Sequence, residues 1–140
     1  MGSPRKVEGP LYGYRAWRLR GNGLYSFTGW RPWPTDVPKA ALCWRNFFPV
    51  NPHVAPGSGC NCGIYAWKNV PSTPCSPQGM APVWGVVELT GKVVSHSMGY
   101  RAQYAKPVAI KYSPGVEEVA VKYGLIVLED LIDWKGNTLV

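Results

Sequence analysis

The stretch VWGVVELTGKVVSH, residues 83–96, decides the fold class of this 140-residue chain. It is rich in valine, a β-branched residue that packs well on the pleated surface of a sheet. Gly91 interrupts it, which predicts a bulge or bend within one long strand rather than a tight hairpin. A second strand is predicted over residues 100–105, which Pro107 interrupts before residues 108–110 continue. A sheet is therefore expected at the centre of the fold.

The residues before this stretch extend the β pattern. Residues 11–20 alternate bulky side chains with small or charged ones, and a Gly-Asn-Gly turn signal at 21–23 leads into residues 24–28. This arrangement predicts a hairpin, and residues 63–67 predict a further short strand. Sixteen Gly, fourteen Pro, seven Trp and eight Tyr agree with many turns and a β-rich fold.

Two short helices are expected beside the sheet. Residues 36–44 are compatible with one short helix. The clearer helix begins near Ser113, a favoured N-cap that is followed by proline, and covers residues 114–123 with one apolar face. Gly124 is the expected stop, after which residues 125–128 are predicted to form a buried strand.

The predicted fold class is α+β, a small and mostly antiparallel sheet or open barrel with one or two helices. Residues 11–140 are predicted to form a single domain, and residues 1–10, which show no periodicity, a flexible arm. No apolar run approaches the roughly 20 residues that span a bilayer, and the first residues lead into no apolar signal-peptide region. We therefore expect a cytoplasmic protein without a membrane partner, whose thiols stay reduced.

All four cysteines and one of the two histidines lie within residues 43–75. A structural zinc site takes four Cys or His ligands. The best set of ligands is Cys43, His53, Cys60 and Cys62. Cys75 is an alternative to His53 or Cys43, and the single residue between Cys60 and Cys62 would put both thiolates on one face of an extended segment. Buried thiols without a metal, or disulfides in a secreted protein, stay open as other interpretations.

The net charge of +7 is unevenly distributed. Residues 1–112 carry thirteen Lys or Arg against three acidic residues, whereas residues 113–140 carry two against five. A basic body suits a polyanionic partner such as nucleic acid, although such a charge also agrees with a role in solubility alone. The scarcity of carboxylates in the body argues against two-metal nucleases and glycosidases, which need clustered acidic residues.

Tryptophans are interleaved with arginines along the basic body. Exposed aromatic rings stack on bases while Arg and Lys hold phosphates, although most tryptophans of a small β domain build its core. Trp30 and Trp33, which lie in a proline-containing segment, are predicted to be exposed and to stack. The predicted phosphate contacts are Arg15, Arg18, Arg20, Arg31 and Arg101.

The tetrapeptide Gly-Tyr-Arg-Ala occurs twice, at residues 13–16 and 99–102. The simpler interpretation is two strands that begin at glycine, with Tyr in the core and Arg at the surface. The functional interpretation places Arg15 and Arg101 on related surfaces, where paired guanidinium forks suit a phosphate or a carboxylate.

A set of short motifs is distinctive in combination. The motifs are GYRAW (13–17), Cys43, HVAP (53–56), CNCGIYA (60–66), GVV (85–87), GKVV (91–94) and HSMGYRA (96–102). In this set the chain resembles small proteins of actinobacteria and their bacteriophages. The resemblance covers residues 11–128 and implies a phage accessory protein in the bacterial host cell as the setting, but no mechanism.

The leading hypothesis is a non-enzymatic binding module for nucleic acid or a nucleotide-like polyanion, with a structural zinc ion. The alternative is a phage accessory protein that binds a host protein, since Trp, Tyr and Arg are typical of interface hot spots. A second alternative is an enzyme in which Cys60 or Cys62 pairs with His53 or His96.

Overall fold

β6 (Val83–Ser95) and β7 (Gly99–Lys111) form a long antiparallel hairpin at the centre of the chain, as the valine-rich stretch predicts. The computed structural model describes residues 5–8 (backbone only), 10–27, 29–43, 54–57, 60–70 and 82–135. β6 bends at Gly91, where φ is +72° and the pairing register shifts between Thr90 and Val93. The predicted bulge in one long strand is therefore confirmed.

A second register shift accommodates Pro107. Proline has no amide hydrogen to donate to a neighbouring strand. The shift lies between Val86 and Val87, which pair with Ala109 and Pro107. β7 therefore continues through the proline instead of ending there.

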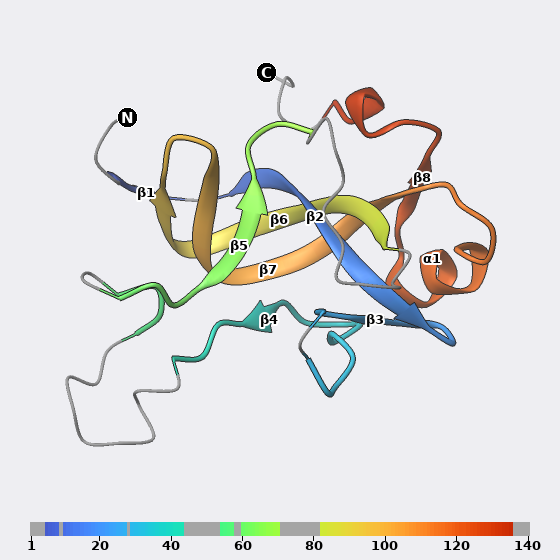
Figure 1. The fold of residues 1–140 in the computed structure, drawn as a ribbon, viewed down its shortest axis with the longest axis horizontal. Helices are drawn as coiled ribbons and strands as arrows, with labels where there is room; N and C mark the ends of the chain where they lie inside the picture. The colour runs from blue at the N-terminus through green and yellow to red at the C-terminus, as the bar shows by residue number, and fades with distance from the viewer. Residues whose placement is uncertain are drawn as a thin grey trace.

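The other strands pair along the two outer edges of this hairpin (Figure 1). The β6 edge pairs with β1 (Arg5–Glu8) and β2 (Leu11–Arg20). The β7 edge pairs in succession with β5 (Ile64–Trp67), β4 (Lys39–Ala40) and β8 (Ile126–Leu128). β2 and β5 meet at the pair Tyr14–Trp67, so that β6, β2, β5 and β7 close into a ring of strands.

The predicted hairpin is present between β2 and β3 (Gly23–Tyr25), and the predicted strand at 63–67 is β5. α1 (Glu117–Tyr123) is the one α-helix among the described residues. It ends at Gly124, whose left-handed conformation is that of the expected stop. The fold is thus α+β, with a mostly antiparallel sheet and a helix against it.

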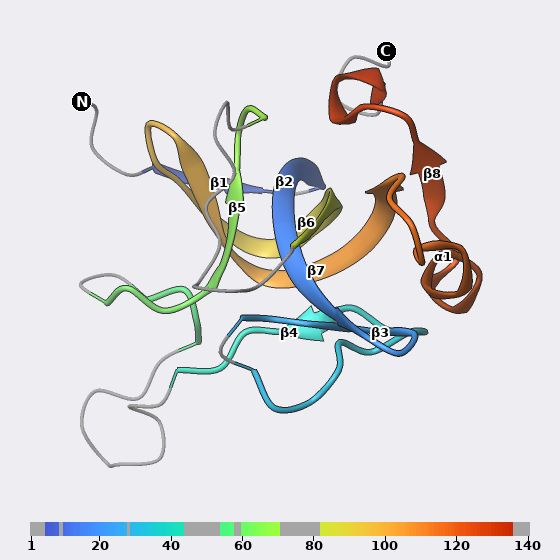
Figure 2. The ribbon, with the colours of Figure 1, turned by 45° about the vertical axis from the view of Figure 1, so that its right-hand side comes forward.

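The main core lies inside the ring of strands and beneath α1. It includes Trp17, Leu89 and Ile110 from the strands and Val119 and Tyr123 from the helix. Figure 2 shows α1 and β8 together on one side of the ring. A smaller cluster on the other face of the sheet is covered by the 3₁₀ helix η2 (Leu131–Asp133). Among the described residues, no helix has the length and apolar character needed to cross a membrane.

Two segments expected to be helical or irregular are strands instead. Residues 39–40, within the expected helix 36–44, form β4, and Ala41 N donates to Gln103 O at 2.7 Å to extend the pairing with β7. Residues 5–8, expected in the flexible arm, form β1 against the end of β6. Both strands are short edge strands that exist through pairing, which local sequence pattern does not report.

Two details of the C-terminal part also differ from expectation. α1 begins after Val116 rather than at Ser113, because Gly115 takes a φ of +93° and makes a turn before the helix. β8 is an edge strand, and Ile126 and Val127 are exposed, so the prediction of a buried strand is wrong.

Candidate metal centre and basic surface

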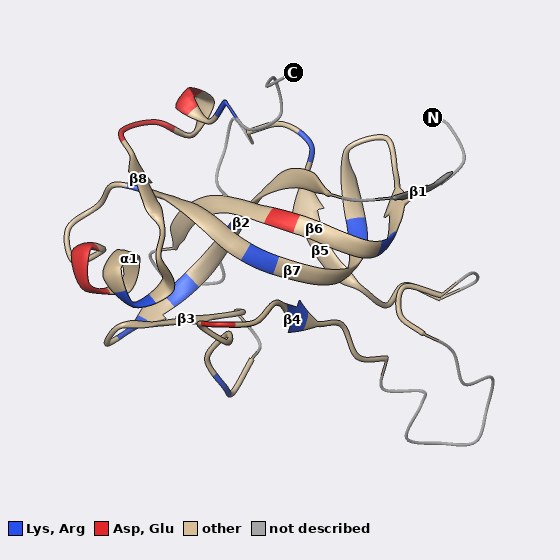
Figure 3. Ribbon diagram, turned by 180° about the vertical axis from the view of Figure 1, so that it is seen from behind, with Lys and Arg blue, Asp and Glu red and all other residues tan. Residues whose placement is uncertain are grey.

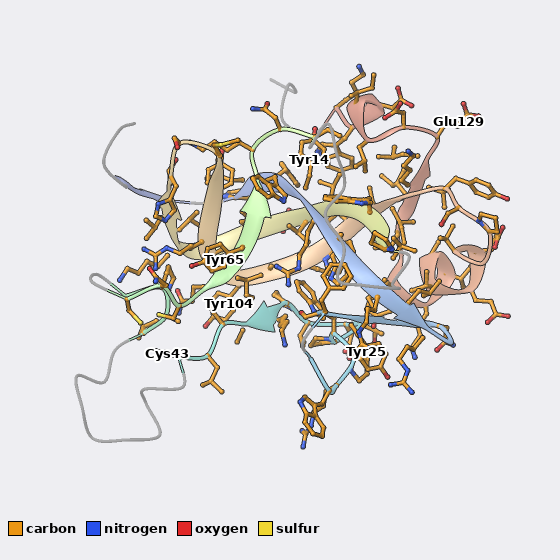
Figure 4. The ribbon with its side chains drawn as sticks, in the orientation of Figure 1. Tyr14, Tyr25, Cys43, Tyr65, Tyr104 and Glu129 are labelled. Carbon is orange, nitrogen blue, oxygen red and sulfur yellow. The ribbon has the colours of Figure 1, made fainter. Side chains whose placement is uncertain are left out.

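Three of the four cysteines meet because β4 and β5 pair with neighbouring parts of the same edge of β7. Ala40 pairs with Tyr104, and Ile64 pairs with Ala102, so the end of β4 and the start of β5 lie next to each other. Cys43 follows β4, and the other two cysteines precede β5 (Figure 4).

The three thiols are close enough to ligate one ion. The Sγ atoms of Cys43, Cys60 and Cys62 all lie within 4.8 Å of one another, and no disulfide joins them. The Sγ atoms of Cys43 and Cys60 are 3.7 Å apart. Tetrahedral zinc with Zn–S bonds of about 2.3 Å would separate its sulfurs by about 3.8 Å. The donor type and spacing therefore fit a tetrahedral thiolate site.

The backbone around the cysteines supports this arrangement. Asn61 is exposed between Cys60 and Cys62, so both thiols turn to the same side, as the single-residue spacer predicts. Gly57 N donates to the Sγ of Cys62 at 3.2 Å, the kind of outer contact that orients a metal ligand. Cys43 is buried, with 1% of its surface exposed.

The electrostatics at Cys62 disfavour a reactive thiolate in the absence of a cation. Burial raises the pKa of Cys62, the amide of Gly57 lowers it, and the neighbouring Cys60 and Cys43 thiols raise it further. A catalytic cysteine instead needs a lowered pKa. The arrangement suits three thiolates that share a bound cation better than a Cys–His nucleophile.

Arg101 hydrogen-bonds the main chain of the loop that carries Cys60 and Cys62. Its side chain is buried, and Nη1 donates to the carbonyl oxygens of both Cys60 and Cys62, the latter at 3.0 Å. Its Nε donates to Nε2 of His96 at 2.8 Å. Burial, then the charges of Arg101 and Lys68, lower the pKa of His96, which favours the neutral ring that can accept this hydrogen bond. Main-chain carbonyls and His96 take the Nε and Nη1 donors of Arg101, so these donors serve the loop, and the phosphate contact of Arg101 stays a prediction.

Two of the predicted ligands lie outside the described residues, namely His53 and Cys75. Within the described part of the chain, Cys43, Cys60 and Cys62 are the one group of three or more Cys, His, Asp or Glu side chains close enough to share a metal.

The two Gly-Tyr-Arg-Ala segments flank β5, one in β2 and one in β7. Arg101 pairs with Tyr65 and lies on the outer face of the ring, whereas Arg15 alternates with Gly13 and Trp17, and Trp17 belongs to the inner core. The two guanidinium groups therefore leave the sheet on opposite faces. The prediction that they share a related surface is wrong.

The remaining predicted arginines lie on or near the β2–β3 hairpin. Arg18 and Arg20 lie over the ring of Tyr25, at 5.5 and 5.8 Å from its centroid, and Arg18 also donates to Gly29 O at 2.8 Å. Arg31 and Trp30 are exposed in the following loop, with 94% of the surface of Trp30 accessible. We call Arg18, Arg20, Trp30 and Arg31 the hairpin surface.

Trp33 does not belong to this surface. Only 1% of it is exposed, and its ring packs edge-on against Trp17 with centroids 5.5 Å apart. Its N–H donates to the hydroxyl of Ser26 at 2.9 Å. The prediction of an exposed, stacking Trp33 is wrong because the loop turns this ring into the core.

Sequence reasoning missed two residues that contribute to the basic region. Tyr25 supplies the ring under Arg18 and Arg20, and Lys39 lies 5.7 Å from the centroid of Trp33. The strand predicted over residues 24–28 could have indicated that the Tyr25 ring lies beside the arginines of the paired strand. Lys39 could not be placed, because its segment was expected to be helical.

The described acidic side chains lie mostly away from the hairpin surface. Figure 3 shows them on α1 and on the chain that follows β8, apart from Glu88 on β6 and Asp36 before β4. Residues 10–43 carry five Lys or Arg against Asp36 alone.

Comparisons with protein-family models, curated proteins and solved structures found no match to this chain.

Proposed function

We propose that the protein is a non-enzymatic binding module for single-stranded nucleic acid, which it holds on the hairpin surface. The observation that carries the proposal is Trp30, an almost fully exposed indole ring beside the exposed Arg31. Bases stack on exposed aromatic rings without sequence preference, while neighbouring Arg and Lys side chains hold the backbone phosphates. No described carboxylate forms an ion pair with Arg18, Arg20 or Arg31, so these charges are available to phosphates.

The cysteine cluster has a structural role in this proposal. Zinc bound by Cys43, Cys60 and Cys62, with His53 or Cys75 as a fourth ligand outside the described residues, would join the end of β4 to the start of β5. The ion would supply folding free energy rather than chemistry, as closed four-ligand zinc sites do. The convergence of three Sγ atoms within 4.8 Å of one another supports this role over a nucleophilic one.

Binding of a fluorescent oligothymidine, measured at several salt concentrations, tests the proposal. We expect the logarithm of the affinity to fall linearly with the logarithm of salt, with a slope of about −2 for three phosphate contacts on a single strand. Trp30→Ala should weaken binding about tenfold, through the loss of one stacked base. Arg31→Ala should also reduce the salt slope by about 0.7.

Two exposed residues outside the hairpin surface provide matched controls. Tyr112→Ala removes an aromatic ring and Lys111→Ala removes a cation at the end of β7. Both variants should bind like the parent protein. Binding that is absent, insensitive to salt, or unchanged in Trp30→Ala and Arg31→Ala would overturn the proposal.

A further inference from the structure

Two cations point into the ring of strands, where apolar residues are expected. Arg15 lies between Gly13 and Trp17 on the inner face of β2, and Trp17 is fully buried in the main core. Lys39 pairs with Ala105, another fully buried core residue, so it shares the inner face of the sheet. Both side chains are half-buried and keep some contact with solvent.

Arg15 and Lys39 meet at the ring of Trp33. The Arg15 guanidinium carbon lies 5.0 Å, and the Lys39 Nζ atom 5.7 Å, from the ring centroid. Arg15 also donates to Tyr65 O at 2.6 Å and to the Ser26 hydroxyl at 3.1 Å. These contacts fix the guanidinium in one orientation. Its Nε is buried and has no hydrogen-bond partner in the described structure.

No carboxylate among the described side chains compensates these two charges. Seven of the eight acidic residues have described side chains, and none of them forms an ion pair with Arg15 or Lys39. The eighth, Glu8, belongs to β1 and pairs with Lys92 at the far end of β6. Burial lowers the pKa of Arg15 to about 10, and burial and then the charge of Arg15 lower that of Lys39. Two half-buried like charges without a counterion are unfavourable unless an anion joins them.

We propose that Arg15 and Lys39, which both contact the Trp33 ring, bind one phosphate group. Two of the five N–H groups of Arg15 donate to Tyr65 and Ser26, and the buried Nε–H is among the three that remain for an oxyanion, while the lysine adds a mobile point charge. The inference deepens the proposed function, because the phosphate would be the one that anchors the strand. The same chemistry would serve free phosphate or a mononucleotide.

Titration of inorganic phosphate by calorimetry tests the site, with chloride at equal ionic strength as the reference. We expect saturable one-to-one binding in the parent protein, weakened about tenfold or more in Lys39→Met, which keeps the aliphatic stem and removes the charge. Lys111→Met, at the exposed end of β7, is the matched control and should bind like the parent. Arg15 ties β2 to β5, so its replacement risks the fold and Lys39 is the better test.

No saturation in the parent, or equal binding in Lys39→Met, would overturn the inference.

Oligothymidines with and without a 5′-phosphate then separate the sources of the phosphate. A 5′-phosphate preference that Lys39→Met abolishes assigns the site to a strand end, and equal weakening of both strands assigns it to an internal phosphate. Phosphate binding without oligonucleotide binding would retain this site for a free phosphate or mononucleotide and overturn the proposed function. Strand binding without phosphate binding would overturn this phosphate site and retain the proposed function.

Discussion

Arg101 is the residue that connects the candidate metal centre to the sheet. Its position in β7 is fixed by pairing with Tyr65, and its guanidinium donates to the main-chain carbonyl oxygens of Cys60 and Cys62. An irregular loop has no strand partner for these carbonyls, and the arginine supplies their donors instead. The sequence predicted that Cys43, Cys60 and Cys62 could meet, with Cys75 as an alternative, but it could not reveal the role of Arg101, because alternation alone places this residue at the surface.

Replacing Arg101 with methionine should weaken both the fold and the metal centre. The lost bonds are charge-assisted and buried, so we expect the free energy of unfolding to fall by about 2–4 kcal/mol. Zinc affinity should fall about 10–100-fold, the usual effect of removing a contact that orients metal ligands. Denaturant unfolding and competition with a chelator measure the two effects. Arg20→Met, at an exposed position, is the control, and unchanged zinc affinity in Arg101→Met would contradict this role.

At the scale of elements, the four-residue β5 is held between the two Gly-Tyr-Arg-Ala segments. Both glycines lie against Ala66: a Cβ added at Gly13 would fall 2.6 Å from the Ala66 Cβ, and one at Gly99 would fall 2.6 Å from the Ala66 oxygen. The glycine that begins each copy of the repeat is therefore explained by close packing on a shared strand. The sequence showed the repeat, but which strand lies between its copies depends on long-range pairing that no local pattern contains.

Gly99→Ala should therefore destabilise the protein. Its Cβ would meet a backbone carbonyl that cannot move without disturbing β5, so we expect a loss of about 2 kcal/mol or more in the free energy of unfolding. Gly29→Ala is the matched control, because its added Cβ would meet Ser26 at 3.4 Å, an ordinary contact. That variant should be neutral or up to about 1 kcal/mol more stable, through reduced entropy of the unfolded chain. Equal effects of the two changes in thermal or denaturant unfolding would contradict this account of the repeat.

At the scale of the whole molecule, the ring of strands brings distant segments to one place. β6 was predictable from its β-branched residues and the β2–β3 hairpin from its alternation and turn residues, and most of β7 was predicted as well. β1 and β4 were not predictable, because each exists only through pairing with an outer edge of the β6–β7 hairpin. The predicted cysteine cluster depends on the same pairing, since β4 and β5 share one edge of β7. Exposure of single side chains was the least predictable property, as Trp33 and Arg101 show.

The central claim is that the cysteines between β4 and β5 form a metal centre that stabilises the fold. Elemental analysis of protein purified without added metal tests it most directly, together with a count of reactive thiols. We expect about one zinc ion per chain, lost together with thermal stability in Cys60→Ser and on treatment with a strong chelator. A metal-free protein whose four cysteines all react with a thiol reagent while it remains folded would contradict the claim.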